Sequence, residues 1–326
     1  MLKKFWRQWA SRAMTAAALG LLAACGSSSK YDEFIPTRIV SVGDQVSYLG
    51  DASLSPAFSD RFTVNNLASE TTINNWVLQL AASYGLSTDL SPTNPSRSIE
   101  ARADAVSNRV TDLSTQLATV TPRSGDMLVV NGGMADILAM ADAVANGTLS
   151  TTQALADIAT AGSNLQDFVL GQVGNYKHIL VINAYDLKNS PYAVNKTFAA
   201  GSGLTTTTFQ QLLHDMTRAF NTALISNAGT FSSGQGVRLF DAETLFLNAN
   251  LYNFGISAAG MSSGTCNSFA SSLVNTTRTA CTTTAAAALH SDYDTYLFAD
   301  DKFPSPVAHR FLGAQAYAFL RSVKGW

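Results

Sequence analysis

The chain has 326 residues and a formal net charge of −2, and only 13% of its residues are charged. A weakly acidic chain without a basic patch is not expected to bind nucleic acid. Once an N-terminal leader is set aside, about 300 residues remain, which suffice for one large domain with a sizeable core or for two small ones.

The N-terminus has the layout of a secretory signal, in which basic residues precede a short apolar run. The apolar run covers residues 13–24 and is too short to span a bilayer. It ends in Leu22-Ala23-Ala24-Cys25-Gly26, which resembles the bacterial lipobox. The resemblance implies that residues 1–24 are a lipoprotein signal peptide and that Cys25 is lipidated. The alternative is an ordinary cleaved signal with an incidental cysteine.

Lipidation would anchor the chain to a membrane, which is the one partner that this segment predicts. Several acyl chains, such as palmitate, hold a protein durably where a single chain is marginal. Residues 25–36 would then be the lipidated N-terminus and a tether, since they include a run of three serines. Gly26, rather than an aspartate, follows the cysteine, and under the rule for Gram-negative lipoproteins this implies the outer membrane of the cell envelope.

Regular elements alternate along the rest of the chain. Short apolar runs predict buried parallel strands at residues 38–42, 126–131, 178–183 and 236–240. Helical spacing of apolar residues predicts helices at residues 74–84, 101–120, 209–225 and 308–323. This alternation indicates an α/β fold with a parallel sheet and helices on both faces, whose ligands bind beyond the carboxyl ends of the strands.

Two segments depart from the alternation. Residues 201–208 are rich in Gly and Thr and are expected to form a surface loop. Residues 250–294 form a Ser/Thr/Ala-rich insertion that contains Cys266 and Cys281. In an oxidising compartment this pair is expected to form a disulfide worth about 3 kcal/mol, and two free thiols are the alternative. Neither cysteine has a second Cys or His at ligand spacing, so no metal site and no cofactor are predicted.

The first expected strand is followed by Val42-Gly43-Asp44-Gln45-Val46-Ser47. This run resembles the Gly-Asp-Ser-x-Ser-Asp block of the SGNH, or GDSL-type, ester hydrolases, in which the serine directly after Gly-Asp is the nucleophile. Gln45 stands in that place, and an amide cannot form an acyl-enzyme. Ser47 lies two residues further on, rotated by roughly half a turn on a helix, and is expected to cap or pack.

The second expected strand end reads Asn131-Gly132-Gly133-Met134-Ala135-Asp136, similar to the Gly-x-Asn-Asp block of the same family. In active members that asparagine donates a hydrogen bond to the oxyanion. Ala135 stands in its place and can donate nothing. Loss of one such donor typically lowers the rate on the order of a hundredfold or more.

The third block is Asp300-Asp301-Lys302-Phe303-Pro304-Ser305, similar to the family's Asp-x-x-His-Pro-Thr block. Asp300 matches the acid of the triad, but Phe303 stands where the general base belongs and cannot accept a proton. His309 lies on the final helix and is expected to be structural or exposed. The other histidines have no serine or acid partner visible from the sequence: His178, His214 and His290.

The resemblance covers nearly all of residues 37–326 and implies a single three-layer α/β/α domain, flavodoxin-like, with a parallel sheet of about five strands. No catalytic set is intact, so the expected function is a catalytically inactive SGNH-fold lipoprotein. It would act as a binding or structural module at the cell envelope, with an acyl ester or an envelope component as ligand. The alternatives are an active carboxylic-ester hydrolase, an esterase or lipase using unrecognised residues, and a surface scaffold without a pocket, because a fold by itself proves no function.

Overall fold

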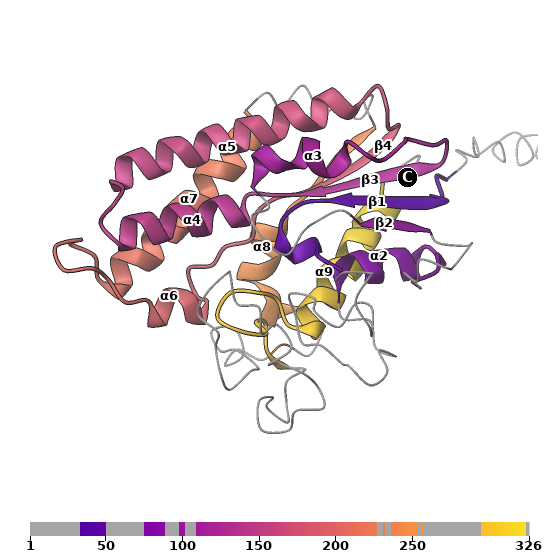
Figure 1. Ribbon diagram of the computed structural model, residues 1–326. Helices are drawn as coiled ribbons and strands as arrows, with labels where there is room; N and C mark the ends of the chain where they lie inside the picture. Colours follow the sequence, from indigo (N-terminus) through magenta and orange to yellow (C-terminus); the bar gives the residue numbers. More distant parts are fainter. Residues whose placement is uncertain are drawn as a thin grey trace, which may run out of the picture. The chain divides into compact units, whose positions relative to one another are not determined.

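The computed structural model describes residues 33–49, 75–88, 98–101, 109–226, 231, 236–252, 256, 295–323 and 326 (Figure 1). They divide into two compact units, residues 35–322 and a small unit drawn from both ends of the chain. In the small unit the rings of Phe34 and Trp326 pack edge to face with centroids 6.3 Å apart. The expectations for Cys25, for Cys266 and Cys281, and for most of the insertion at 250–294 lie outside the described residues.

The larger unit is built on a sheet of five parallel strands in the order β2-β1-β3-β4-β5. The strands are β1 (Arg38–Val42), β2 (Ile99–Ala101), β3 (Asp126–Asn131), β4 (His178–Ile182) and β5 (Val237–Phe240). Every residue of β1 and β3 is buried, as expected of strands covered on both faces. All five carboxyl ends therefore meet at one edge of the sheet, called the carboxyl edge below.

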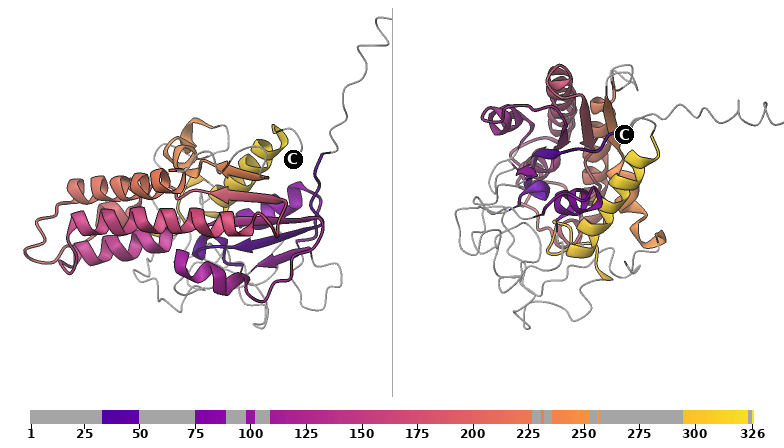
Figure 2. Two further views of the ribbon diagram at one scale, coloured as in Figure 1. Left: turned by 90° about the horizontal axis from the view of Figure 1, so that it is seen from above. Right: turned by 90° about the vertical axis from the view of Figure 1, so that its right-hand side faces the viewer.

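Helices cover the sheet on both faces, as Figure 2 shows from two further directions. Helix α2 packs against α9, while α4, α5 and α7 pack against one another. The helical segments are η1 (Gln45–Ser47), α2 (Trp76–Ser83), η2 (Val110–Asp112), α3 (Leu113–Leu117), α4 (Met134–Ala145), α5 (Thr151–Gln172), α6 (Pro191–Asn195), α7 (Thr206–Leu224), α8 (Ala242–Leu247), η4 (Ala249–Leu251) and α9 (Pro306–Arg321). The predicted α/β class, with a parallel sheet between helical layers, is confirmed.

Glycines allow the closest approaches on the α5 and α7 side. A Cβ at Gly162 of α5 would lie 2.3 Å from the backbone carbonyl oxygen of Phe220, so the backbones of α5 and α7 approach closely here. A Cβ at Gly133 would lie 2.5 Å from the ring of the same Phe220. Gly133 also has a φ of +102°, in the left-handed region that favours glycine. It thereby turns the chain directly from β3 into α4 at the carboxyl edge.

The four predicted strands agree with β1, β3, β4 and β5 to within one residue at each end. The fifth strand, β2, was not located from the sequence because its three residues form no apolar run. The predicted helix at 101–120 is wrong at its start, where Ala101 ends β2. Among the described residues of this range, only Leu113–Leu117 is α-helical, after the 3-10 turn η2. Arg109 has an extended backbone conformation, so the helical turn begins only at Val110. At the other end, Pro122 disfavours helical backbone at the residue before it.

The predicted loop at 201–208 ends at Thr205, whose hydroxyl caps α7 by accepting from the Thr208 N–H at 3.2 Å. Helix α7 therefore begins three residues before the predicted start at 209. Within the described part of the chain, none of the helices combines the length and the apolarity that crossing a bilayer requires.

Candidate functional site

The buried carboxylate of Asp44 holds the first two motif blocks together. Its Oδ1 accepts from the Val46 N–H at 3.1 Å and from Asn131 Nδ2 at 2.6 Å. Its Oδ2 accepts from the Met134 N–H at 3.1 Å, at the start of α4. Burial raises the pKa of Asp44 to about 6, although the three N–H donors act in the opposite direction. Both carboxylate oxygens are thus engaged in joining the end of β1 to the end of β3.

Ser47 belongs to the same network. Its hydroxyl donates to Asn131 Oδ1 and accepts from Trp76 Nε1 at 3.2 Å. The side chain has no exposed surface. The backbone N–H of Trp76 in turn donates to His309 Nδ1 at 3.2 Å. Ser47 and His309 therefore join η1, α2 and α9, which agrees with the packing role predicted for Ser47 and the structural role predicted for His309.

The Gly-x-Asn-Asp-like block begins α4 directly after β3. Ala135 lies in the first turn of the helix and is buried. Asp136, the next residue, accepts from the Val110 N–H at 3.0 Å through Oδ2. Burial raises the pKa of Asp136 to about 6, mainly because the carboxylate loses water, while the bond from Val110 acts to lower it. The acid of this block thus fixes η2, and its neighbour offers no hydrogen-bonding side chain.

The third block forms a tight turn before α9. Asp300 Oδ1 accepts from the backbone N–H groups of Lys302 at 2.9 Å and Phe303 at 2.7 Å. Burial and the neighbouring Asp301 carboxylate raise the pKa of Asp300 above its ordinary value. The side chain of Phe303 is buried, with 3% of the residue exposed. Asp300 therefore stabilises the turn that carries Phe303, rather than orienting a base.

Tyr185 links this third block to the carboxyl edge. It follows β4, and its hydroxyl donates to the Lys302 carbonyl at 3.0 Å. Burial raises the pKa of Tyr185 well above its ordinary value, and the nearby charges of Asp44 and Asp300 act in the same direction. Hydrogen bonds of Asp44 connect the first two blocks. Tyr185 is bonded to the third block and lies close enough to Asp44 and Asp300 to feel the charge of both.

The chemistry available at this edge is limited. Gln45 is 2% exposed, and its Oε1 has no hydrogen-bond partner among the described residues. Within the same part of the chain the Ser47 hydroxyl is bonded to the side chains of Asn131 and Trp76, and neither can accept its proton as a general base. Nucleophile and base are thus not paired at the positions where the family resemblance places them.

One group of side chains at the carboxyl edge was missed from the sequence. His214, for which no acid partner was visible, has its Nδ1 2.5 Å from Asp186 Oδ2. Glu243 lies in the first turn of α8, next to this pair. A signal was present, because Asp186 closely follows β4 and Glu243 closely follows β5, and parallel strands bring such positions to one edge.

Solved structures that are similar to the chain include two Streptomyces enzymes. The extracellular lipase from Streptomyces rimosus has 13% sequence identity and a TM-score of 0.41, and the alignment covers 85% of this chain and 97% of that one. The phospholipase A1 from Streptomyces albidoflavus NA297 has 15% identity and a TM-score of 0.45, with 88% and 99% covered. A scan against protein-family models found no match, and a search of curated proteins found none. Neither structural similarity is close enough to carry information about activity.

Proposed function

We propose that the chain is a catalytically inactive, SGNH-like lipoprotein that acts as a binding or structural module at the cell envelope, anchored through lipid on Cys25. The observation that carries the proposal is the pair of substitutions at the reacting positions. Gln45 follows Gly43-Asp44 at the end of β1, and Phe303 follows the Asp300 turn. An amide and a phenyl ring supply neither an attacking oxygen nor a group that could activate one.

The alternative of an active ester hydrolase requires another nucleophile, and Ser47 is the nearest serine to the family position. Its hydroxyl is buried and is held between Asn131 and Trp76 Nε1. An acyl ester would have to displace these contacts before it could reach the oxygen. His309, the histidine of this region, receives the Trp76 backbone N–H on Nδ1 instead. These contacts favour the inactive module over the enzyme.

A binding role is favoured over a mere remnant because the framework of the edge is kept. Asp44 still accepts three hydrogen bonds and still joins β1 to β3. Ligands of open parallel sheets bind beyond this edge, so a rigid edge remains suited to holding a ligand after the chemistry is lost. An acyl ester or another envelope component is the proposed ligand class.

The enzyme question is tested by exposing the purified chain to a fluorophosphonate probe and to short-chain and long-chain p-nitrophenyl esters. The expected result is no labelling and hydrolysis no faster than the buffer blank. Ser47→Ala serves as the matched control and should behave identically. Ester hydrolysis by the unmodified chain that disappears in Ser47→Ala would replace the proposal with the esterase alternative.

The anchor is tested separately by growing cells with a clickable palmitate analogue. The unmodified chain should incorporate the label and fractionate with the outer membrane, because the lipobox-like run ends at Cys25. Cys25→Ser should remain unlabelled and retain its leader. Equal labelling of both chains would contradict lipidation at this cysteine.

A further inference from the structure

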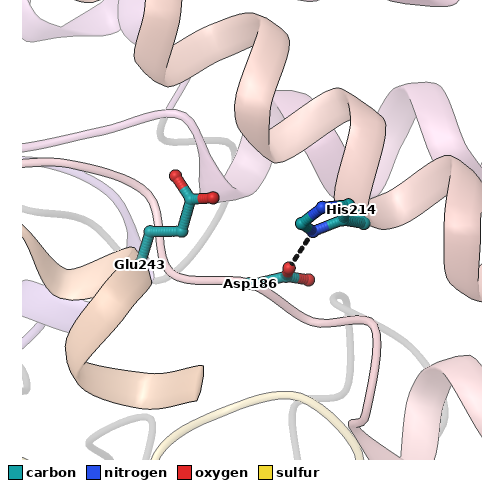
Figure 3. A group of neighbouring side chains, drawn as sticks. All are labelled: Asp186, His214 and Glu243. Carbon is teal, nitrogen blue, oxygen red and sulfur yellow. Dashed lines mark hydrogen bonds and ion pairs between the residues drawn. The ribbon is translucent and has the colours of Figure 1, made fainter. Parts of the chain in front are cut away.

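Asp186, His214 and Glu243 form a compact group that none of the three motif blocks includes (Figure 3). Asp186 lies in the segment after β4, His214 in α7 and Glu243 in α8. Each offers one ligand atom, and these atoms all lie within 4.8 Å of one another. Three elements that are far apart in the sequence thus direct an imidazole and two carboxylates to a single point.

Two buried asparagines hold this arrangement in place. Asn183, at the end of β4, accepts through Oδ1 from the backbone N–H groups of Ala242 at 2.6 Å and Glu243 at 3.2 Å, which fixes the first turn of α8. Asn221 of α7 accepts from the Ala184 N–H at 3.0 Å and donates to the Ala184 carbonyl at 2.9 Å. Asn221 Nδ2 also donates to Glu243 Oε2 at 2.8 Å. The strand end and both helices are therefore locked together around the group.

Hydrogen bonds from the protein hold one oxygen of each carboxylate. Asp186 Oδ1 accepts from the Lys188 N–H at 2.8 Å, while Oδ2 is the atom that faces His214. Glu243 uses Oε2 for Asn221. Orientation of ligating carboxylates by hydrogen bonds to the second oxygen is typical of metal sites in proteins.

In the part of the chain that the structure describes, no lysine or arginine forms an ion pair with this group. Among the same residues, His214 is the one basic side chain paired with Asp186. The Asp186 side chain is fully buried, whereas His214 keeps 19% of its side-chain surface exposed. A buried carboxylate with a second one nearby is costly unless a cation compensates it.

We infer that Asp186, His214 and Glu243 bind a divalent first-row transition-metal ion of the Zn²⁺ or Mn²⁺ type. One imidazole with two carboxylates matches the nitrogen and oxygen ligands that such ions take, whereas Mg²⁺ and Ca²⁺ prefer oxygen alone. Zn²⁺ binds these atoms at about 2.0 to 2.2 Å. Binding would therefore release the proton shared by Asp186 and His214 to solvent, move these two side chains apart from their 2.5 Å separation and draw Glu243 inward. Three protein ligands leave a coordination position for water or a ligand atom.

The competing explanation is a purely structural cluster, in which the Asp186 to His214 bond ties the segment after β4 to α7. Calorimetric titration of Zn²⁺ into the whole chain distinguishes the two, provided that the protein carries no histidine tag and was first treated with a chelator. The expected result is one equivalent of Zn²⁺ per chain.

Glu243→Gln should weaken the affinity of the chain for Zn²⁺ at least about a hundredfold, because it removes an anionic ligand. Its amide oxygen can still accept from Asn221, so the fold should survive.

The matched control is Asp215→Asn, which removes one exposed carboxylate next to His214 on the same helix. It should bind Zn²⁺ as the unmodified chain does. His214→Gln provides a second variant on a partly exposed residue, and urea unfolding without metal verifies that both variants are folded. Failure of the unmodified chain to bind Zn²⁺ would overturn the inference, and so would unchanged affinity in both Glu243→Gln and His214→Gln.

Co²⁺ supplies a readout that a structural role would not change. The Co²⁺ form should show visible d–d bands that shift or disappear in Glu243→Gln and remain in Asp215→Asn. A near-ultraviolet thiolate-to-cobalt band would assign the metal to cysteine, and it would overturn the inference even if the stoichiometry were one. This test does not involve ester hydrolysis, so its result is independent of the proposed loss of catalysis.

Discussion

Asp44 and Asp186 both follow buried strands at the carboxyl edge of the sheet, yet their surroundings differ. Asp44 is surrounded by three N–H donors of the protein, which use both of its oxygens. Asp186 has one oxygen on a backbone N–H and turns the other toward His214, with Glu243 nearby. The same residue type at the same edge thus completes a structural network in one place and contributes to a group of convergent ligands in the other.

The difference lies in what would satisfy each carboxylate. Two backbone N–H groups and the buried Asn131 amide satisfy Asp44, so its interactions contribute to folding and leave no oxygen for a ligand. A titratable imidazole and a second carboxylate leave Asp186 suited to a cation. Removal of each carboxylate should therefore have different consequences for stability.

Asp44→Ala should lower the free energy of unfolding by about 3 to 5 kcal/mol, because it leaves three buried donors without an acceptor. Asp186→Ala, measured without metal, should cost only about 1 to 2 kcal/mol, because its partner His214 is partly exposed and can bind water. Urea unfolding followed by circular dichroism measures both.

Asp157→Ala on α5 is the control, since this carboxylate is exposed and, among the described residues, accepts from the Gln153 side chain alone. Its effect should stay within about 0.5 kcal/mol. Equal losses for Asp44→Ala and Asp186→Ala would remove the distinction between the two regions and would indicate that both are structural.

The fold was largely predictable from the sequence because buried parallel strands read as short, mainly apolar runs. Residues 38–42 and 126–131 contain such runs, with polar residues mostly at their ends, and match β1 and β3. β2 has only Ile-Glu-Ala and is defined by its pairing with β1, so no local pattern could reveal it. The failed helix at 101–120 has helical apolar spacing, but the Asp136 carboxylate accepts from the Val110 N–H across the fold, a contact no local pattern contains.

The sequence points to candidate site residues only where a motif resemblance fixes the spacing. Gln45, Ala135 and Phe303 were singled out because the residues around them resemble the SGNH blocks in the same order. The pairing of Asp186 with His214 depends on how α7 lies against the segment after β4, over a separation of 28 residues. Such a contact is set by helix packing and leaves no spacing rule in a single sequence.

Asp136 allows the structural region to be tested through pH. Burial raises its pKa from 3.8 to about 6 in the folded chain. A raised pKa means that the folded state retains a proton that the unfolded chain loses, so this carboxyl stabilises the fold at low pH and the contribution is lost as the pH rises through 6. Asp136→Asn keeps an oxygen for the Val110 N–H and removes the titration.

Between pH 4.5 and pH 7.5 the unmodified chain should lose about 2 kcal/mol of unfolding free energy that the Asp136→Asn chain does not lose. The stability of the variant relative to the unmodified chain should therefore rise by that amount. The measurement is urea unfolding of both chains at the two pH values, compared as a double difference. A double difference of zero would show that Asp136 stays ionised in the folded chain throughout this range, and that the Val110 bond outweighs burial.

The smallest expected effect concerns Gln45, which the motif resemblance matches to the nucleophile position of SGNH hydrolases. Its Oε1 is buried without a hydrogen-bond partner among the described residues, which costs free energy on folding. Gln45→Met keeps the length of the side chain and removes that acceptor, so it should raise the free energy of unfolding by about 1 kcal/mol. Gln45→Ser, which restores the hydroxyl of the family, should instead lower it by about 1 to 3 kcal/mol through the cavity it leaves.

The order of the three side chains is therefore informative, with Met the most stable, Gln intermediate and Ser the least. That order would mean that the edge is packed around a long side chain at position 45 and no longer accommodates the serine of a hydrolase. Thermal and urea unfolding of the three chains under one set of conditions measure it. If Met is less stable than Gln, the Gln45 amide has a polar partner whose loss outweighs the gain. If the Gln45→Ser chain is as stable as the unmodified chain, the space around position 45 still accommodates a serine. The region around Asp44 could then no longer be described as purely structural.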